Sequence, residues 1–186
     1  MRQNPNMSNS NNSFIKRCMN LQDHATCFFK LLCKPHIKEF LHMDKCCALI
    51  DKYILVGVFI YFLRAEFGVE DYSTRNFYIA LYLCHEIYEE VNSLKFQIAK
   101  RCLGNCVRNR DCVKRFDEDR FYLLQRMNFH VIYDKSHCNL IFSRFPHVVW
   151  YRIRSDVHHG VIVDEDKICS ACKWPVVSNL KLNKLK

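Results

Sequence analysis

The longest apolar stretch of the chain runs from Asp51 to Phe67, where DKYILVGVFIYFLRAEF has polar side chains only near its two ends. A helix that is apolar on almost every side is buried on almost every side. The stretch is too long for a typical buried strand. It therefore predicts the central helix of a folded core, with Asp51 as N-cap and a neighbouring helix packed closely against Gly57.

Apolar residues spaced three and four positions apart predict further helices on both sides of this segment. The sequence from Phe28 to Leu41 fits an amphipathic entry helix that is interrupted or restarted at Pro35. Gly68 is expected to end the central helix, and Ser73 or Thr74 to cap the next one. The remaining helices are expected at residues 76–91, 93–103, 111–127 and 134–145, which gives five or six helices in all.

The two ends of the chain do not share this pattern. Residues 1–13 are rich in Asn and Ser and have almost no apolar side chains, so burial cannot offset the entropy of ordering them. Beyond Trp150 the helical period decays into a basic and histidine-rich sequence. We therefore expect a disordered tail over residues 1–26, one helical domain over 27–159, and an irregular basic extension over 160–186.

Composition supports an all-α fold in a reducing environment. The chain has only four Gly and four Pro, fewer than the turns of an all-β sandwich need. It has twelve Cys, but the first residues, MRQNPN, lack the apolar region of a signal peptide, so we expect free thiols and no secretion. The apolar run from Ile54 to Leu63 is about half a bilayer span, which predicts no membrane helix.

The formal net charge of +9 widens the range of partners without selecting one. Basic residues cluster from Lys100 to Arg115 and again at Lys181, Lys184 and Lys186. Such clusters suit nucleic acid, an acidic protein surface or an anionic membrane, and they are equally compatible with solvated helix faces.

The chain has no GxSxG, HExxH, phosphate-binding glycine loop or paired-carboxylate motif, so we assign no catalytic residue and expect no enzyme. The clearest chemical pattern is the CxxC formed by Cys169 and Cys172. Two thiolates can share a tetrahedral zinc ion, with His158 or His159 as a further ligand. One CxxC is half a site, so no cofactor is expected unless other residues complete it.

Two further groups of residues have alternative interpretations. Glu86, Glu89 and Glu90 gather at a predicted helix C-terminus, where negative charge opposes the helix dipole, so they are either a functional acidic segment or simply solvated. Cationic and aromatic residues mix in a segment that fits either an anion-binding surface or a strap packing Trp150 onto the core, and we favour the strap. Its members are Arg144, His147, Trp150, Arg152, Arg154, His158 and His159.

Several segments, taken in order, resemble the Speedy/RINGO family. They are FFKLL at 28–32, FLHMDKCCALIDKYILVGVFIYFLRAEF at 40–67, DYSTRNFYIALYL at 71–83, Leu103-Gly104 with the basic stretch after it, Cys138, Pro146, WYRIRSDVHH at 150–159 and CSAC at 169–172. The resemblance covers roughly residues 27–172, and the combination of MDKCC, DKYIL and NFYIALYL is far more specific than any single motif.

The resemblance implies a single cyclin-box-like helical domain that binds a cyclin-dependent kinase as the monomeric partner in a heterodimer. Such a module switches the kinase on by stabilising its active conformation, and so promotes cell-cycle or meiotic progression in the nucleus, with the cytoplasm as a second location. By position, the kinase-facing residues are expected to be Asp51, Lys52, Tyr53, Arg64, Glu86, Glu89 and Glu90. The alternative is core packing for Tyr53 and solvent exposure for the others.

The chain departs from the family in the segment expected to engage the kinase activation loop. Only Glu86, Glu89 and Glu90 match a longer acidic run in the family, and Arg101-Cys102 replaces the aromatic residue before Leu-Gly. Two other functions therefore stay open. One is a relative that binds the kinase without activating it, and the other is a basic cyclin-like module that tethers to nucleic acid or chromatin.

Overall fold

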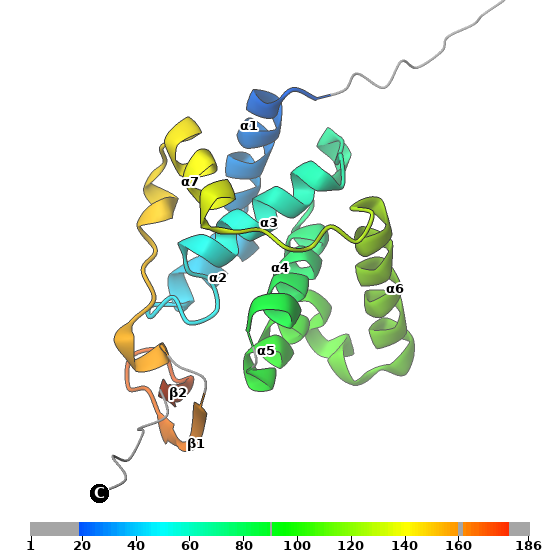
Figure 1. Ribbon diagram of the computed structural model, residues 1–186. Coiled ribbons are helices and arrows are strands. Elements are labelled where there is room, and N and C mark those ends of the chain that lie inside the picture. Colours follow the sequence, from blue (N-terminus) through cyan, green and yellow to red (C-terminus); the bar gives the residue numbers. More distant parts are fainter. Residues whose placement is uncertain (1–18, 90, 160–161, 179–186) are drawn as a thin grey trace, which may run out of the picture.

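The computed structural model describes residues 19–89, 91–159 and 162–178 of the chain. In this part, helices and short 3-10 turns form the main body, and a small β-hairpin lies at one end (Figure 1). The α-helices of the described part are α1 (Leu21–Leu32), α2 (Pro35–Met43), α3 (Lys52–Arg64), α4 (Thr74–Tyr88), α5 (Asn92–Leu103), α6 (Arg110–Arg126) and α7 (Lys135–Arg144). The predicted helical fold class is confirmed.

Helix α3 is the centre of the core, as its apolar sequence predicts. Every residue from Ile54 to Phe62 is buried. The Asp51 carboxylate accepts the backbone N–H groups of Tyr53 and Ile54 and so caps the helix. The predicted end at Gly68 is wrong, because the helix stops at Arg64.

A Schellman motif explains why α3 ends early. Glu66 adopts a left-handed backbone conformation with φ 49°, although it is not a glycine. Its N–H donates to the Leu63 carbonyl, and the N–H of Phe67 donates to the Phe62 carbonyl. Phe67 then turns inward against Phe62, with ring centroids 4.8 Å apart. The buried contact between Phe67 and Phe62 thus stabilises a left-handed conformation at a position where the sequence has Glu66 instead of the usual glycine.

The entry segment forms two helices rather than one, which raises the count above the expected five or six. Pro35 is the first residue of α2, where its missing N–H costs nothing. Helix α1 begins at Leu21, inside the segment expected to be a disordered tail, because Asn20 and Asp23 form a reciprocal capping box. The expectation for residues 1–13 lies outside the described residues.

The segment between α6 and α7 crosses α3 on the face seen in Figure 1. Its Tyr133 is buried over Gly57, where an added methyl group would overlap the tyrosine ring and hydroxyl. The Tyr133 hydroxyl donates to the Tyr53 carbonyl at 3.3 Å. The close approach expected at Gly57 is therefore present, but a side chain makes it instead of a helix.

After α7 the chain runs back along the loop between α2 and α3. Trp150 is buried in the core, and its indole N–H donates to the Phe145 carbonyl at 2.7 Å. The aromatic and cationic segment therefore packs Trp150 as a strap, which is the favoured one of the two interpretations.

The extension expected to be irregular contains a two-stranded antiparallel hairpin of β1 (Ile162–Ile168) and β2 (Pro175–Ser178). Alternating and β-branched residues in IVDEDKI and PVVS favour extended backbone once a neighbouring strand is present. Figure 1 shows this hairpin at the end of the strap, beside the α2–α3 loop. Among the described residues, no helix is long and apolar enough to cross a membrane.

Candidate functional site

The α2–α3 loop is organised by a buried carboxylate, that of Asp44. Its two oxygens accept the backbone N–H groups of Ala48, Leu49 and Ile50 at 2.8–3.2 Å. Arg152 from the strap forms an ion pair with the same carboxylate at 3.0 Å, and also donates to main-chain carbonyls of the loop and of the last turn of α2. Buried charge is tolerated here because it is paired and fully hydrogen-bonded.

A second strap arginine joins two of the residues predicted to face a kinase. Arg154 donates to both carboxylate oxygens of Glu89, at 2.9 and 2.5 Å, and lies 3.1 Å from Asp51. The three side chains are only 13–17% exposed. Burial lowers the pKa of Arg154, but the bonds to Glu89 and the charge of Asp51 outweigh it and the net pKa is raised. The end of α4 and the start of α3 are thereby held together.

Glu86 also has an internal partner. Arg120 of α6 contacts both of its carboxylate oxygens, at 2.7 and 2.6 Å. Both side chains are about a quarter exposed. Glu86 and Glu89 therefore engage two different arginines and do not form one acidic surface, while Glu90 lies outside the described residues.

Lys52 and Tyr53 flank the start of α3 on its outer side. The Lys52 ammonium lies 5.1 Å from the Tyr53 ring and 5.7 Å from the Phe142 ring of α7. Tyr53 is 38% exposed, so its side chain is partly packed against the chain and partly accessible to a partner. At the other end of α3, Arg64 donates to carbonyls in the α6–α7 segment. Arg64 thus fixes that segment over α3.

The acidic residues can be identified from the sequence, but their pairing with particular arginines cannot. Arg154 is 103 residues from Asp51 and 65 from Glu89 in the sequence. Arg120 is 34 residues from Glu86. No spacing rule connects residues this far apart, although a buried carboxylate implies that some cation must pair with it.

The structure completes the half-site suggested by the CxxC. Cys46, His158, Cys169 and Cys172 are all buried, and their ligand atoms all lie within 4.8 Å of one another. Cys46 comes from the α2–α3 loop, His158 from the 3-10 turn η4 (Asp156–His158), and the other two from the hairpin turn. His159 is elsewhere, with its Nε2 directed at the Arg154 carbonyl.

The hairpin turn directs backbone donors at these sulfurs. The N–H groups of Cys172 and Ala171 donate to the Cys169 thiolate and lower its pKa to about 6. Burial raises the pKa of Cys172, while the Trp174 N–H acts in the opposite direction. Cys46, 123 residues before Cys169, was missed because ligand spacing rules cover only local pairs.

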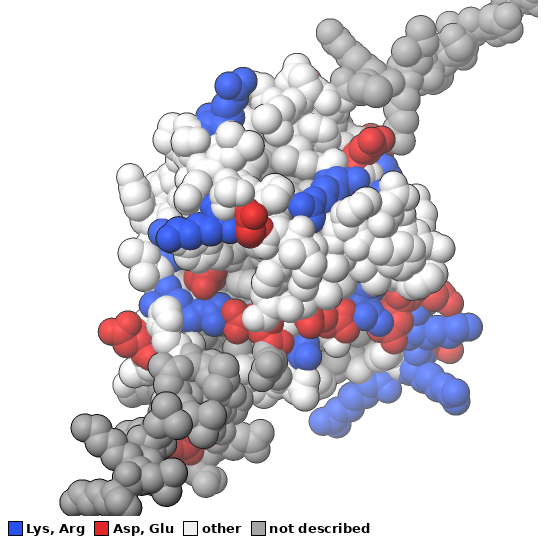
Figure 2. Space-filling model, in the orientation of Figure 1, with Lys and Arg blue, Asp and Glu red and all other residues white. Residues whose placement is uncertain are grey.

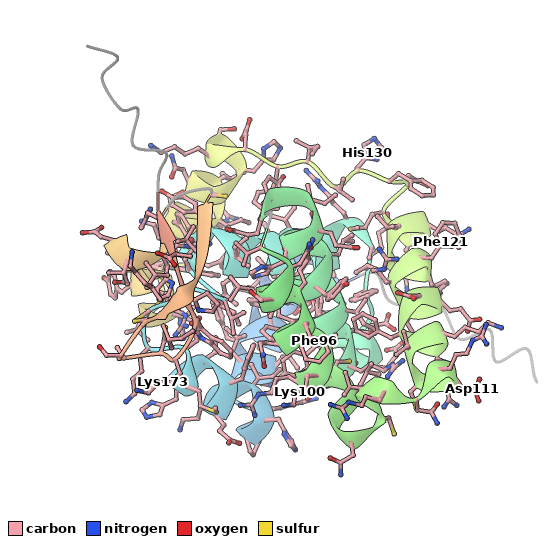
Figure 3. The ribbon with its side chains drawn as sticks, turned by 90° about the horizontal axis from the view of Figure 1, so that it is seen from below. Phe96, Lys100, Asp111, Phe121, His130 and Lys173 are labelled. Carbon is pink, nitrogen blue, oxygen red and sulfur yellow. The ribbon has the colours of Figure 1, made fainter. Side chains whose placement is uncertain are left out.

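The basic charge is distributed unevenly over the chain. Six basic residues lie outside the described part, in segments that contain no acidic residue. They are Arg2, Lys16, Arg17, Lys181, Lys184 and Lys186. On the face shown in Figure 2, acidic and basic side chains lie next to each other in a band across the lower half. Figure 3 shows Lys100 on α5, between Lys173 of the hairpin turn and Asp111 near the start of α6. The folded part is therefore of mixed charge on these faces.

Comparison with known proteins identifies the class to which this fold belongs. A family model described as Spy1, cell cycle regulatory protein, matches residues 23–154, which include α3 and the strap arginines. The chain belongs to this family.

Speedy proteins are among its relatives. Rat Speedy protein A is 36% identical over 158 residues, covering 82% of this chain and 50% of that protein. Human Speedy protein C is 33% identical over 137 residues, covering 72% of this chain and 48% of that protein. The resemblance to the Speedy family is confirmed, and the chain spans about half the length of these curated relatives.

Proposed function

We propose that the chain binds a cyclin-dependent kinase and stabilises its active conformation, promoting cell-cycle or meiotic progression in the nucleus. Membership of a cell cycle regulatory family supports a regulatory function. The kinase itself is implied by the resemblance of the helical domain to cyclin-like activators. In such a complex the chain binds the active conformation of the kinase more tightly than the inactive one and so shifts the equilibrium towards it. The catalytic residues belong to the kinase.

One observation carries the proposal: Arg154 fixes the start of α3 beside the end of α4. These are the two segments that the resemblance assigns to the kinase interface. The bidentate contact with Glu89 and the contact with Asp51 order both segments before any partner binds. A surface ordered in advance loses less conformational entropy on association.

The internal pairs support a division of labour among the kinase-facing residues. We assign direct contact to Tyr53 and Lys52, whose aromatic and cationic groups lie at the outer side of α3. Asp51, Glu86 and Glu89 act as positioning residues through their arginines, and Arg64 positions the α6–α7 segment. For Glu90, the proposed contact with the kinase activation loop rests on the sequence alone.

The test mixes the purified chain with an unphosphorylated cyclin-dependent kinase and measures co-elution and histone phosphorylation. We expect a one-to-one complex with raised kinase activity. Tyr53→Ala should weaken binding about tenfold or more, as loss of an interface aromatic commonly does. Tyr122→Ala is the matched control, because Tyr122 is an exposed aromatic on α6, and it should bind like the unmodified chain.

Three results would contradict the proposal. Failure of the unmodified chain to co-elute with the kinase removes it. Co-elution without a gain in histone phosphorylation identifies a relative that binds but does not activate. Absence of a kinase complex together with steeply salt-dependent DNA binding favours a nucleic-acid tether instead.

A further inference from the structure

We infer that Cys46, His158, Cys169 and Cys172 bind one structural zinc ion, which joins the C-terminal hairpin to the α2–α3 loop. The inference does not depend on the proposed kinase partner. It starts from the placement of four buried ligand atoms within 4.8 Å of one another, contributed by three separate segments of the chain.

The donor set selects the metal. Three thiols and one imidazole form the Cys₃His combination typical of structural zinc sites, whereas calcium and magnesium prefer oxygen ligands. Four protein ligands also fill a tetrahedral shell. The ion would therefore have no open position for a substrate, which favours a structural role over a catalytic one.

Two of the distances between ligand atoms are close to those around a shared tetrahedral ion. With a zinc–sulfur bond of about 2.3 Å, two sulfurs on one ion lie about 3.8 Å apart. The Cys46 and Cys169 sulfurs are 3.8 Å apart, far beyond the bond length of a disulfide. The His158 Nε2 atom is 3.0 Å from the Cys172 sulfur, where a shared zinc would need about 3.6 Å, so the imidazole has to move outward only slightly.

The hairpin turn has the backbone geometry of a metal-binding knuckle. The Lys173 N–H donates to the Cys169 carbonyl at 2.9 Å, and Lys173 takes a left-handed conformation with φ 64°. The turn also directs the N–H groups of Ala171 and Cys172 at the Cys169 sulfur. Such outer-shell donors orient thiolate ligands and partly neutralise their charge.

The size of the local core indicates why a metal is needed. Among the described residues, the buried members of the cluster around the hairpin turn are Cys46, Cys169 and Cys172, with Trp174 and Val176 packed against them, while Val177 of β2 joins the main core. A two-stranded hairpin with so small a cluster of its own is marginal in water. Small units of this kind are commonly completed by a structural metal.

The site would also support the surface that Arg154 organises. Cys46 lies in the same loop as Asp44, and its carbonyl accepts the N–H of Ser155 at 2.9 Å. The backbone N–H of Lys52 donates to the Arg152 carbonyl at 2.9 Å. A metal ion that holds His158 beside Cys46 therefore fixes one end of the strap segment that carries Arg152 and Arg154, and the bond between Lys52 and Arg152 holds the other end.

The experiment measures metal in the chain of residues 1–186, purified under reducing conditions with zinc supplied. We expect about one zinc per chain, and cobalt substitution should give the intense visible bands of tetrahedral thiolate coordination. Cys46→Ser, Cys169→Ser and His158→Ala should lose stoichiometric metal. His158→Cys should retain it, because a Cys₄ site is equally suited to zinc, and this separates ligand loss from misfolding.

Two neighbours provide matched controls. Cys47 is buried next to Cys46, and His159 follows His158, but neither belongs to the four-ligand cluster. Cys47→Ser and His159→Ala should both retain full zinc. The inference is overturned if the unmodified chain holds no stoichiometric zinc, if zinc survives Cys46→Ser at full occupancy, or if mass spectrometry without reductant finds Cys46 in a disulfide as the stable form.

Discussion

Arg154 and Glu89 form a bidentate ion pair in which both guanidinium NH₂ groups contact the carboxylate. The pair joins the strap to the end of α4, and the same guanidinium reaches Asp51 at the start of α3. One cation thus compensates two carboxylates that are each less than a fifth exposed. Removal of the cation would leave two partly buried negative charges facing each other.

Substitution of Arg154 tests this arrangement. Arg154→Ala should lower the free energy of unfolding by roughly 3 kcal/mol, because breaking a buried pair leaves its partners uncompensated. Arg154→Met combined with Asp51→Asn and Glu89→Gln should recover much of the loss, since no unpaired charge remains and Asn still caps α3. Urea denaturation measures both variants. Equal destabilisation of the single and triple variants would contradict the charge argument.

A charge exchange separates the structural role of Glu86 from direct kinase contact. Glu86→Arg places like charges together and should cost about 1 kcal/mol, a modest value because both side chains are about a quarter exposed. The double variant Glu86→Arg with Arg120→Glu restores the pair in reverse. We expect it to recover both stability and kinase activation. Recovery of stability without activation would instead assign Glu86 to direct contact.

The central helix and the all-α fold class could be predicted because they depend on local sequence. Asp51 caps α3 as expected, and the run from Ile54 to Phe62 is buried throughout. Pro35 marks the restart of the entry segment. The end of α3 was missed because Glu66 takes a left-handed conformation that its residue type disfavours, supported by the tertiary packing of Phe67.

The site was harder to predict because its interactions are long-range. The ligand set suggested from Cys169 and Cys172 could not include Cys46, which no motif connects with them. The hairpin was missed because a seven-residue strand with three acidic residues has little hydrophobic signal of its own. Its order depends on the antiparallel partner and on the cysteine–histidine cluster, neither of which is visible in a local window.

Because Tyr133 contacts Gly57, we expect a Gly→Ala substitution at this position to change stability in the opposite direction from the usual one. In the interior of an exposed helix, Gly→Ala stabilises by about 1 kcal/mol. Here the added methyl would overlap the Tyr133 ring, with Cε1 only 2.7 Å away, so Gly57→Ala should instead destabilise by about 2 kcal/mol.

The control removes the obstacle. In a Tyr133→Ala background the same Gly57→Ala substitution should become neutral or stabilising, and thermal unfolding of the four proteins of this cycle gives the coupling. Destabilisation of the same size in both backgrounds would show that Tyr133 is not what restricts residue 57.

The buried histidine of α4, His85, predicts a loss of stability in mild acid. It is fully buried, its Nε2–H donates to the Leu49 carbonyl at 2.6 Å, and its buried Nδ1 has no hydrogen-bond partner among the described residues, which disfavours a second proton on the ring. Burial lowers its pKa below the usual 6.5 and the positive charge of Arg154 acts in the same direction, while the bond to the Leu49 carbonyl and the carboxylates of Glu89 and Asp51 oppose the shift without reversing it. The unfolded chain therefore binds a proton near pH 6.5 that the folded chain does not.

Because the unfolded state binds more protons, stability from His85 is complete above about pH 6.5 and declines as the pH falls towards the lower folded pKa. The decline is at most about 1.4 kcal/mol per pH unit for one group. His85→Gln keeps an N–H donor for Leu49 but cannot titrate. Urea unfolding from pH 7.5 to pH 5.5 should therefore show a smaller loss of unfolding free energy for His85→Gln than for the unmodified chain. Acid effects at the other histidines are common to both proteins and cancel in the difference between the two profiles. Parallel profiles would mean that the pKa of His85 is the same in the folded and the unfolded chain.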